Sequence, residues 1–474
     1  MSATLDKAAD RHMRPTDAFA WYMERDPLLR STVVTVGLLD RLPDLAVLRD
    51  RMERGSRVVP SFRDRLVVPP LRLARPRWVQ VDDLDLSWHL RHVALAAPGS
   101  FAQLLELARH EATTAFDPAR PLWTLTTVEG LAGGRAAFVM KFHHALMDGI
   151  GGIQLVTELF DLEREGGARE EVASPPGEHV EGWRLLRDTL AYDAARLARF
   201  AVRSPVGAAR TTANLVRHPA DAARTMASVA RTVEPYFTTL SPVMRDRRLH
   251  RSLDALEVPL SSLRVAASSH GGHLNDAFLA AVTGGLRRYH AEHGHDVSDL
   301  RVTLPVSVRR PDDPPGGNRI TLMRFKVPAG SPDPAERVRS MHRVVDRIRA
   351  ERSLPHTQGI AAALNLLPPG FVGSMLKHVD FLASDVPGVP VPLYLAGAKV
   401  QRWYPFGPTI GASVNLTLMS YVDTCCIGIN VDTGAVPDPD RLVACLREGF
   451  VEVLGLAGDG DGVRRPVEEA TWTS

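Results

Sequence analysis

A strand-free span in the middle of the chain separates two parts that each mix short β-rich runs with amphipathic helical runs. From Trp183 to Tyr236 the sequence is rich in Ala and Arg, and apolar side chains recur at helical spacings of three and four residues. Strand-like and helix-like patterns occupy the chain up to about residue 165 and return from about 251 to 455. The 474 residues also exceed what one hydrophobic core usually serves. We therefore predict an α/β protein of mixed sheets with flanking helices, arranged as two lobes.

The predicted organisation has four parts along the chain. They are an N-terminal lobe over 1–165, a basic helical connector over 166–250, a C-terminal lobe over 251–455 and a flexible tail over 456–474. The stretch 184–251 contains 13 Arg against 5 Asp or Glu, although the whole chain carries only +2. Two interpretations of the connector stay open, a linker packed across both lobes and a helix that lies on a membrane surface.

Charge and cysteine content exclude several classes of protein. The 57 basic and 55 acidic side chains nearly cancel, so no overall basic field marks a nucleic-acid-binding protein. Three cysteines, two of them adjacent at Cys425 and Cys426, cannot cross-link a chain of this size and match no zinc spacing. The first residues lack the apolar stretch of a signal peptide, and no uninterrupted apolar run reaches about 18 residues. We therefore expect a cytoplasmic protein without a membrane span.

Residues 136–162 contain the best candidate for catalysis. An apolar strand ends there at His143 and His144, a short loop with Asp148 and Gly149 follows, and a helical pattern begins after the glycines. Ligands of open α/β sheets gather at such strand ends, and the spacing allows Asp148 to fold back beneath the second imidazole. A neutral histidine can take a proton from an alcohol at neutral pH. Asp148 would orient this base directly or hold the loop by pairing with an arginine, while Gly149 permits the turn.

Two other interpretations of these residues stay open. The histidines and the Asp-Gly pair could form a satisfied core or turn cluster, or they could hold a metal ion. A metal site is disfavoured because adjacent residues of an extended segment point apart and no HExxH or further His/Cys cluster accompanies them. The chain has no GxSxG and no Walker loop, and its glycines miss the third position of a dinucleotide fingerprint. A covalent acyl-enzyme, a nucleoside triphosphate and NAD are therefore not supported.

The motif HHALMDG resembles the HHxxxDG motif of the bacterial wax ester synthase/diacylglycerol acyltransferase family, a branch of the chloramphenicol-acetyltransferase-like, condensation-domain superfamily. Further blocks that resemble this family follow in its order: PTDAF at 15–19, PSFRDRL at 60–66, PLW at 121–123, LNDAFLAAVTGGLRRY at 274–289, LPVSVR at 304–309, GNR at 317–319, VPLYLAGAKV at 391–400 and MSY at 419–421. The resemblance runs from about residue 13 to 455, and the joint occurrence of the blocks is specific. One segment departs from the family, because SDVPGV at 384–389 stands where an SNVPGP-like segment is usual.

The resemblance implies two chloramphenicol-acetyltransferase-like lobes with an active-site tunnel between them. It implies an acyl-CoA-dependent O-acyltransferase that acts on a long-chain alcohol or diacylglycerol and produces wax ester or triacylglycerol. It assigns the general base to His144 and makes His143 mainly positional. Acyl-CoA is then a co-substrate, and no metal, prosthetic group or nucleic acid is expected. The protein would work on the cytoplasmic side, at the inner membrane face or at lipid droplets, with its oligomeric state left open.

Two rival hypotheses keep the fold and change the function. In one, the acceptor is an amine, a short alcohol or a carrier-bound substrate. In the other, the chain is a non-catalytic lipid-binding protein. The intact HHxxxDG motif argues against the second, since a protein that has lost its catalytic activity has no physical need for His144 beside Asp148.

Two further segments supply candidate supporting residues. In the run 299–309 apolar and polar residues alternate, so a strand should place Ser307 and Arg309 on one face, and Arg309 is the predicted partner of Asp148. The alternative is a surface strand with a solvated arginine. Asn275 opens a helical pattern with Asp276, which is typical of a helix N-cap. Alternatively, Asn275 lines the tunnel or polarises the thioester carbonyl.

Overall fold

The computed structural model describes most of both predicted lobes. The described residues are 11–69, 75–146, 155–167, 169–178, 183, 187, 190–191, 194, 224, 227–230, 234–307, 320–351, 354–458 and 462–463. Most of the predicted connector and most of the predicted tail lie outside these residues. The connector residues 169–178 contain no helix. Three arginines of the helix Leu45–Val58 donate to main-chain carbonyls at the start of the connector: Arg51 to Gly167, Arg54 to Glu170 and Arg57 to Val172.

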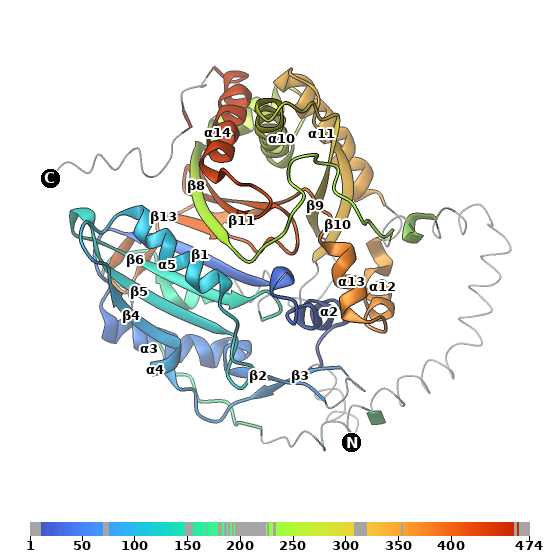
Figure 1. The fold of residues 1–474 in the computed structure, drawn as a ribbon. Coiled ribbons are helices and arrows are strands. Elements are labelled where there is room, and N and C mark those ends of the chain that lie inside the picture. The colour runs from blue at the N-terminus through green and yellow to red at the C-terminus, as the bar shows by residue number, and fades with distance from the viewer. Residues whose placement is uncertain are drawn as a thin grey trace.

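A seven-stranded sheet forms the core of the lower lobe in Figure 1. Its strands in spatial order are β4 (Leu90–Ala94), β5 (Trp123–Leu131), β6 (Arg135–His143), β1 (Thr32–Leu39), β13 (Ala398–Phe406), β12 (Tyr394–Leu395) and β7 (Phe160–Asp161). β1 is central because it pairs antiparallel with both β6 and β13. The sheet thus takes residues 394–406 from the C-terminal half of the chain. The chain boundaries assigned to the lobes from the sequence stay a prediction.

Short helices and a hairpin surround this sheet. They are α2 (Pro15–Met23), α3 (Leu45–Val58), α4 (Leu86–His89), α5 (Phe101–Thr113), the 3₁₀ turns η1 (Pro27–Leu29), η2 (Pro60–Arg63) and η4 (Ala132–Gly134), and the strands β2 (Asp64–Val67) and β3 (Arg77–Gln80). The sequence specifies where the longer helices begin: Asp44 accepts hydrogen bonds from the first turn of α3, and Ser100 forms a capping box with Gln103 in α5.

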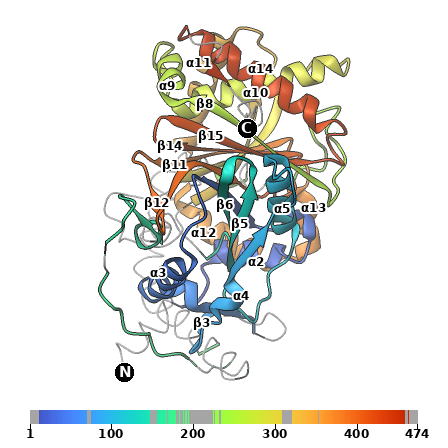
Figure 2. The same cartoon turned by 90° about the vertical axis from the view of Figure 1, so that its left-hand side faces the viewer.

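A six-stranded sheet forms the core of the upper lobe. Its strands in spatial order are β10 (Ile320–Pro328), β9 (Asp299–Ser307), β11 (Phe381–Val389), β14 (Val414–Tyr421), β15 (Thr424–Asp432) and β8 (Arg251–Pro259). The helices of this half are α9 (Leu260–Ser268), α10 (Leu274–Glu292), α11 (Pro334–Arg349), η5 (Leu354–His356), α12 (Thr357–Leu364), α13 (Pro369–Leu376) and α14 (Pro439–Gly455). α9, α10, α11 and α14 lie together above the sheet (Figure 2).

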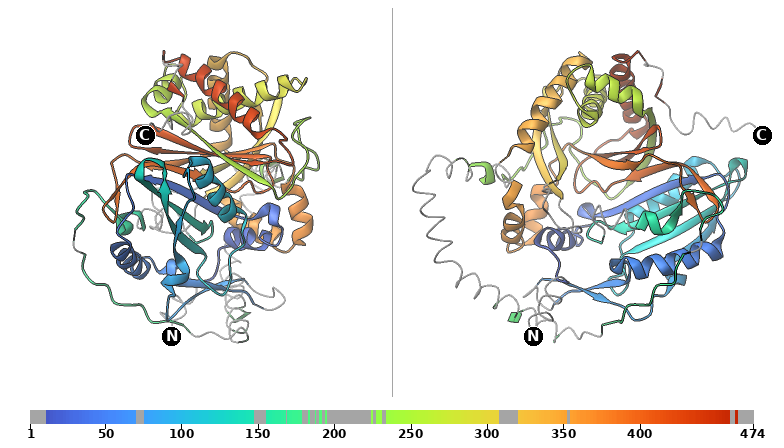
Figure 3. Two further views of the ribbon diagram at one scale, coloured as in Figure 1. Left: turned by 60° about the vertical axis from the view of Figure 1, so that its left-hand side comes forward. Right: turned by 180° about the vertical axis from the view of Figure 1, so that it is seen from behind.

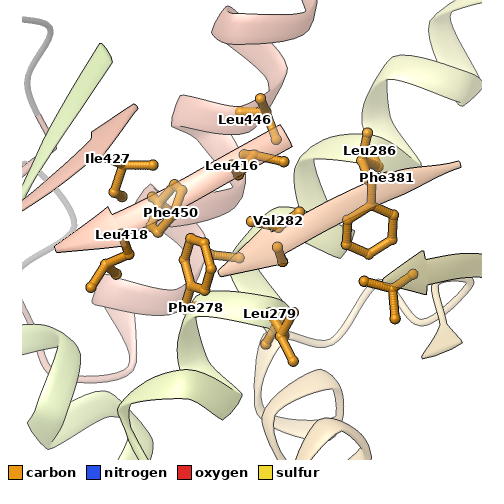
Figure 4. Close-up of a cluster of buried hydrophobic side chains, with 14 of the residues drawn as sticks. Phe278, Leu279, Val282, Leu286, Phe381, Leu416, Leu418, Ile427, Leu446 and Phe450 are labelled. Atoms are coloured by element: carbon orange, nitrogen blue, oxygen red, sulfur yellow. The ribbon is translucent and has the colours of Figure 1, made fainter. Parts of the chain in front are cut away.

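The core of this lobe lies between the sheet and the helices α10 and α14. Phe278 of α10 packs against Phe450 of α14, with ring centroids 6.2 Å apart, and both are fully buried (Figure 4). The two helices approach closely because glycines face the contact. A Cβ added to Gly285 would lie 2.5 Å from the Cα of Leu446.

The six-stranded sheet has a second core on its other face, which packs against the seven-stranded sheet. Along β15, Cys425 belongs to the core beneath the helices, whereas Cys426 belongs to the core shared with the seven-stranded sheet. Both thiols are buried and free. The two adjacent cysteines are therefore residues of two different cores. Gly428 lies on the same face of β15 as Cys426, and a Cβ there would lie 1.8 Å from the carbonyl oxygen of Pro405 in β13.

A polar cluster also joins the two sheets. Glu257 of β8 accepts hydrogen bonds from the hydroxyl of Tyr404 and from Nε of Arg402, the latter at 3.0 Å. Tyr404 and Glu257 are both buried, and burial together with the charge of Glu257 holds the pKa of Tyr404 well above its ordinary value. The tyrosine therefore remains a neutral donor that ties β13 to β8.

Candidate active site

The turn after β6 holds His144 at the junction of the two lobes. The N–H of His143 donates to the carbonyl of Leu122, and the N–H of His144 donates to the carbonyl of Ser31 at 3.0 Å. The N–H of Leu146 then donates to the carbonyl of His143, which closes the turn. The backbone at both histidines is thus fixed by neighbouring segments of the same lobe.

The side chain of His143 lies behind this turn and is fully buried. Its Nε2 lies 3.1 Å from Oε1 of Glu24, and its Nδ1 accepts the N–H of Ala145 at 3.1 Å. Since Nδ1 is an acceptor here, the ring proton sits on Nε2 and is donated to Glu24. The rings of Trp21 and Phe116 pack edge-on against the imidazole. Both ring nitrogens are engaged in local structure, so this histidine holds the turn.

The side chain of His144 instead lines a cavity between the lobes. The cavity encloses about 1350 Å³ of empty space, its open mouth included. Burial, with a smaller contribution from the neighbouring His143, lowers the pKa of His144 to about 4. The imidazole is therefore neutral at pH 7, the state that a general base requires.

The cavity wall is mainly apolar and comes from both halves of the chain. α2 contributes Thr16, Asp17, Phe19, Ala20 and Met23; α12 and α13 contribute Thr357, Ile360, Ala361, Leu364, Val372, Met375 and Leu376; the remaining lining residues are Leu29, Ser31, Thr303, Thr321, Leu322, Arg324, Val379, Leu382 and Ile410. A long cavity wall of this composition, with few polar groups near one base, suits an alkyl chain with a reactive polar end.

Arg324 of β10 is one of the few ionisable groups in this lining. Its Nη1 donates to the carbonyl of Met375 at 3.4 Å, and its guanidinium lies 5.7 Å from the ring centroid of Tyr236. Burial lowers the pKa of Arg324 from its ordinary value, although an arginine remains charged at neutral pH. The side chain thus presents positive charge in an apolar surrounding.

Several residues predicted from the sequence lie outside the described part of the chain. They are Asp148, Gly149 and Arg309, so the predicted pairing of Asp148 with Arg309 stays a prediction. β9 is confirmed over Asp299–Ser307, and the side chain of Ser307 also lies outside what the structure describes. The described part of β9 is buried, since Arg301 is 5% exposed and Thr303 lines the cavity, while the alternative of a solvated Arg309 stays open.

Asn275 is not the N-cap of α10. The N-cap of α10 is His273, whose side chain and main chain form a capping box with Asp276. Asn275 is the second residue of the helix and is not among the described residues that line the cavity. Its Nδ2 is buried and has no hydrogen-bond partner among the described residues. A role for Asn275 as an oxyanion donor stays a prediction.

The structure adds Glu24 and Ser31 to the candidate site. The carboxylate of Glu24 accepts from Nε2 of His143 and from the N–H of Ser31, while the carbonyl of Ser31 accepts from the N–H of His144. The sequence carries one weak signal for Glu24, an acidic residue directly after the apolar helix that contains PTDAF. Nothing in the pattern around Ser31 identifies it.

Asp385 and Val389, where the sequence departs from the family, are not among the described lining residues.

Comparison with known proteins identifies close relatives along nearly the whole chain. The profile described as the wax ester synthase/diacylglycerol acyltransferase catalytic domain matches residues 13–278, and the WS/DGAT C-terminal domain matches residues 316–453. A Mycobacterium tuberculosis protein named a diacylglycerol O-acyltransferase is 34% identical over 463 residues, which cover 94% of this chain and 92% of the relative. A second M. tuberculosis protein with the same type of name is 30% identical over 429 residues, covering 86% of this chain and 82% of the relative.

Solved structures show the same fold. The wax ester synthase/diacylglycerol acyltransferase from Marinobacter aquaeolei matches with a TM-score of 0.61 and 22% identity, over 94% of this chain and 100% of that chain. The first condensation domain of the CDA synthetase matches with a TM-score of 0.58 and 15% identity, over 96% of this chain and 99% of that chain. The predicted α/β fold with two chloramphenicol-acetyltransferase-like lobes is therefore confirmed.

Proposed function

Because the chain belongs to the wax ester synthase/diacylglycerol acyltransferase family, a family of acyltransferases, we propose that it transfers a fatty acyl group from acyl-CoA to a hydroxyl. The acceptor is a long-chain alcohol, diacylglycerol or both, and the product is wax ester, triacylglycerol or both. The observation that carries this proposal is the neutral His144 in the wall of a mainly apolar cavity. Such a cavity accommodates alkyl chains and brings their polar ends to a base.

In the proposed mechanism, His144 acts directly on the acceptor. Its neutral imidazole takes the hydroxyl proton while the oxygen attacks the carbonyl carbon of the thioester. The tetrahedral intermediate collapses with cleavage of the carbon–sulfur bond, and the CoA thiolate leaves and recovers the proton from the imidazolium. These steps require no metal or prosthetic group, and acyl-CoA takes part in them as a co-substrate.

His143 has a positioning role in this scheme. Its hydrogen bonds to Glu24 and to the N–H of Ala145 fix the turn that carries His144. We also propose that Asp148 pairs with Arg309 and so holds the loop after the histidines, with Gly149 providing backbone freedom. This pairing rests on the sequence alone, and a charge-swap double variant tests it: if the pair exists, exchange of the two charges restores part of the activity that either single reversal removes.

The proposed site of action is a lipid surface on the cytoplasmic side. Among the described residues, no helix is long and apolar enough to cross a membrane. The alkyl acceptors are poorly soluble in water, so the protein would meet them at the inner membrane face or on lipid droplets without spanning either.

Release of free CoA is the measurement that tests this function. Purified protein is mixed with palmitoyl-CoA and separately with hexadecanol, dioleoylglycerol, a short alcohol and a long-chain amine, and the products are identified by mass spectrometry. Wax ester or triacylglycerol is expected, and the His144→Ala variant serves as the matched control. The proposal is overturned if the protein releases CoA only with the amine, or if it releases no CoA with any of the acceptors.

A further inference from the structure

The helices α12 and α13, with the turn between them, form a segment that is apolar on both of its faces. We call residues 357–376 the apolar hairpin. This stretch contains no Asp, Glu, Lys, Arg or His. Figure 3 shows both helices beside α2, at the side of the molecule. A helix that is apolar all round normally lies in a protein core or in lipid, so the surroundings of each face need an explanation.

The inner face of the apolar hairpin is accounted for by the protein itself. Ile360, Ala361 and Leu364 of α12 line the cavity that contains His144, as do residues of α13. Two hydrogen bonds fix the hairpin to α2: Nε2 of Gln358 donates to Oγ1 of Thr16 at 3.2 Å, and Nδ2 of Asn365 donates to the carbonyl of Pro15 at 2.9 Å. The hairpin is thus a fixed wall of the cavity.

The outer face of the apolar hairpin has no covering element among the described residues. Leu366 is 87% exposed, Leu367 is 41% exposed and Phe371 is 51% exposed. These three large apolar side chains lie within one turn and the start of α13. Single exposed apolar residues are normal, but a contiguous group without charges marks a surface that meets another apolar phase.

The chemistry of this face favours lipid over a protein partner. A protein interface has a polar rim with hydrogen bonds around its apolar centre, whereas hydrocarbon requires no polar partner. The outer face offers no ionic group over the whole length of the hairpin. Its position is also informative, because the same two helices separate this exposed face from the cavity. Leu322 of β10 lines the cavity as well and is 42% exposed.

We propose that the outer face of the apolar hairpin docks on a phospholipid membrane, with Leu366, Leu367 and Phe371 inserted among the lipid chains. This inference rests on the proposed function, because docking at this face would bring an acceptor dissolved in the membrane next to the cavity mouth. The contact is apolar and therefore independent of headgroup charge. The arginine-rich connector predicts the opposite behaviour, a binding to anionic lipid that salt weakens.

Flotation with vesicles of pure phosphatidylcholine tests the docking surface without any turnover. The full chain is compared with the variant L366S/L367S/F371S at low and high salt. The control L45S/V47S/V265S replaces three exposed apolar residues of α3 and α9, 40%, 39% and 51% exposed, away from the apolar hairpin (Figure 2). We expect salt-insensitive binding that falls by at least about tenfold in the hairpin variant and is retained in the control. Circular dichroism melting shows that both variants are folded.

A turnover measurement separates docking from catalysis. With hexanoyl-CoA and hexanol, which dissolve in water, the hairpin variant should release CoA as the parent does. With hexadecanol or dioleoylglycerol in the vesicles, its rate should fall several-fold. The proposal is overturned if the hairpin variant binds these vesicles like the parent, if binding requires anionic lipid, or if only triolein droplets are bound. Absence of turnover by the parent with every substrate would contradict the proposed function and leave the flotation result interpretable.

Discussion

Nε2 of His143 lies 3.1 Å from Oε1 of Glu24, and the next residue, His144, lies in different surroundings. The carboxylate binds the first imidazole inside the lobe, where Nδ1 of the same ring also accepts the N–H of Ala145. The second imidazole, on His144, is left to line the cavity. One acidic residue at the end of α2 thus binds His143 inside the lobe, while His144 lies in the cavity wall.

Replacing His144 by Ala should lower kcat by about 10² to 10⁴, because a general base contributes a factor of this size. The fold should persist, since the side chain lies in the cavity wall. CoA release and thermal melting measure the two effects. A folded variant with the parent's kcat would show that another group takes the proton.

Replacing Glu24 by Ala should lower both stability and kcat. The change leaves the Nε2–H of His143 and the N–H of Ser31 without their acceptor, which costs about 1 to 3 kcal/mol of the free energy of unfolding. In Glu24→Gln the amide oxygen can still accept, so this variant should recover most of the loss. Urea unfolding and kcat with KM provide the readouts. Equal damage from Ala and Gln would show that the negative charge, and not the hydrogen bond, is what matters.

The pH dependence of kcat/KM reports the pKa of His144 in the free protein. Burial lowers this pKa to about 4, so the imidazole loses its proton at a lower pH than an ordinary histidine and remains a competent base as pH falls. The acid limb should therefore lie near pH 4, whereas an unperturbed histidine would place it near about 6.5. Melting curves at each pH confirm that the protein stays folded. An acid limb at about pH 6.5 would show that water solvates the imidazole of His144 in the free protein.

Tyr404→Phe should destabilise the contact between the two sheets. The substitution keeps the ring that packs against Phe101 and removes the hydroxyl that donates to Glu257. A hydrogen bond to a charged acceptor contributes about 1.5 to 3 kcal/mol, so the free energy of unfolding should fall by that amount. Since Tyr404 is not among the described cavity residues, kcat should be unchanged for the folded variant. An unchanged urea midpoint would show that Arg402 alone satisfies Glu257.

Asp64→Asn should stabilise the protein above about pH 6 and have little effect near about pH 4. Burial raises the pKa of Asp64 from 3.8 to about 6, and Glu178 acts in the same direction while Arg11 opposes it. A raised carboxyl pKa means that the folded state holds the proton more tightly, so stability is lost as pH rises through this range. This rise in pKa corresponds to an expected gain of about 3 kcal/mol at pH 8, measured by urea unfolding. A loss at that pH would show that the 3.8 Å contact with Arg11 outweighs the burial cost.

The sequence by itself determined the local elements and the chemistry of the motif. Alternation of apolar and polar residues identified β9, capping residues fixed the starts of helices such as α5, and the strand that ends at His143 and His144 was visible from its apolar run. These features depend on neighbours within a few residues, so the pattern of the chain records them. The order of family blocks likewise identified the two-lobed fold.

The tertiary structure alone decided how these elements serve a site. β13 pairs with β1, although its residues come from the other half of the chain, and such a pairing leaves no local pattern. Arg301 of β9 is buried, and its guanidinium donates to the carbonyls of Thr238 and His378, which are distant in the sequence. The separation of His143 from His144 depends on Glu24, and the cavity depends on α2 meeting α12 and α13. Contacts between distant segments form only when the chain folds, and these contacts bury His143 inside the lobe and place His144 in the cavity wall.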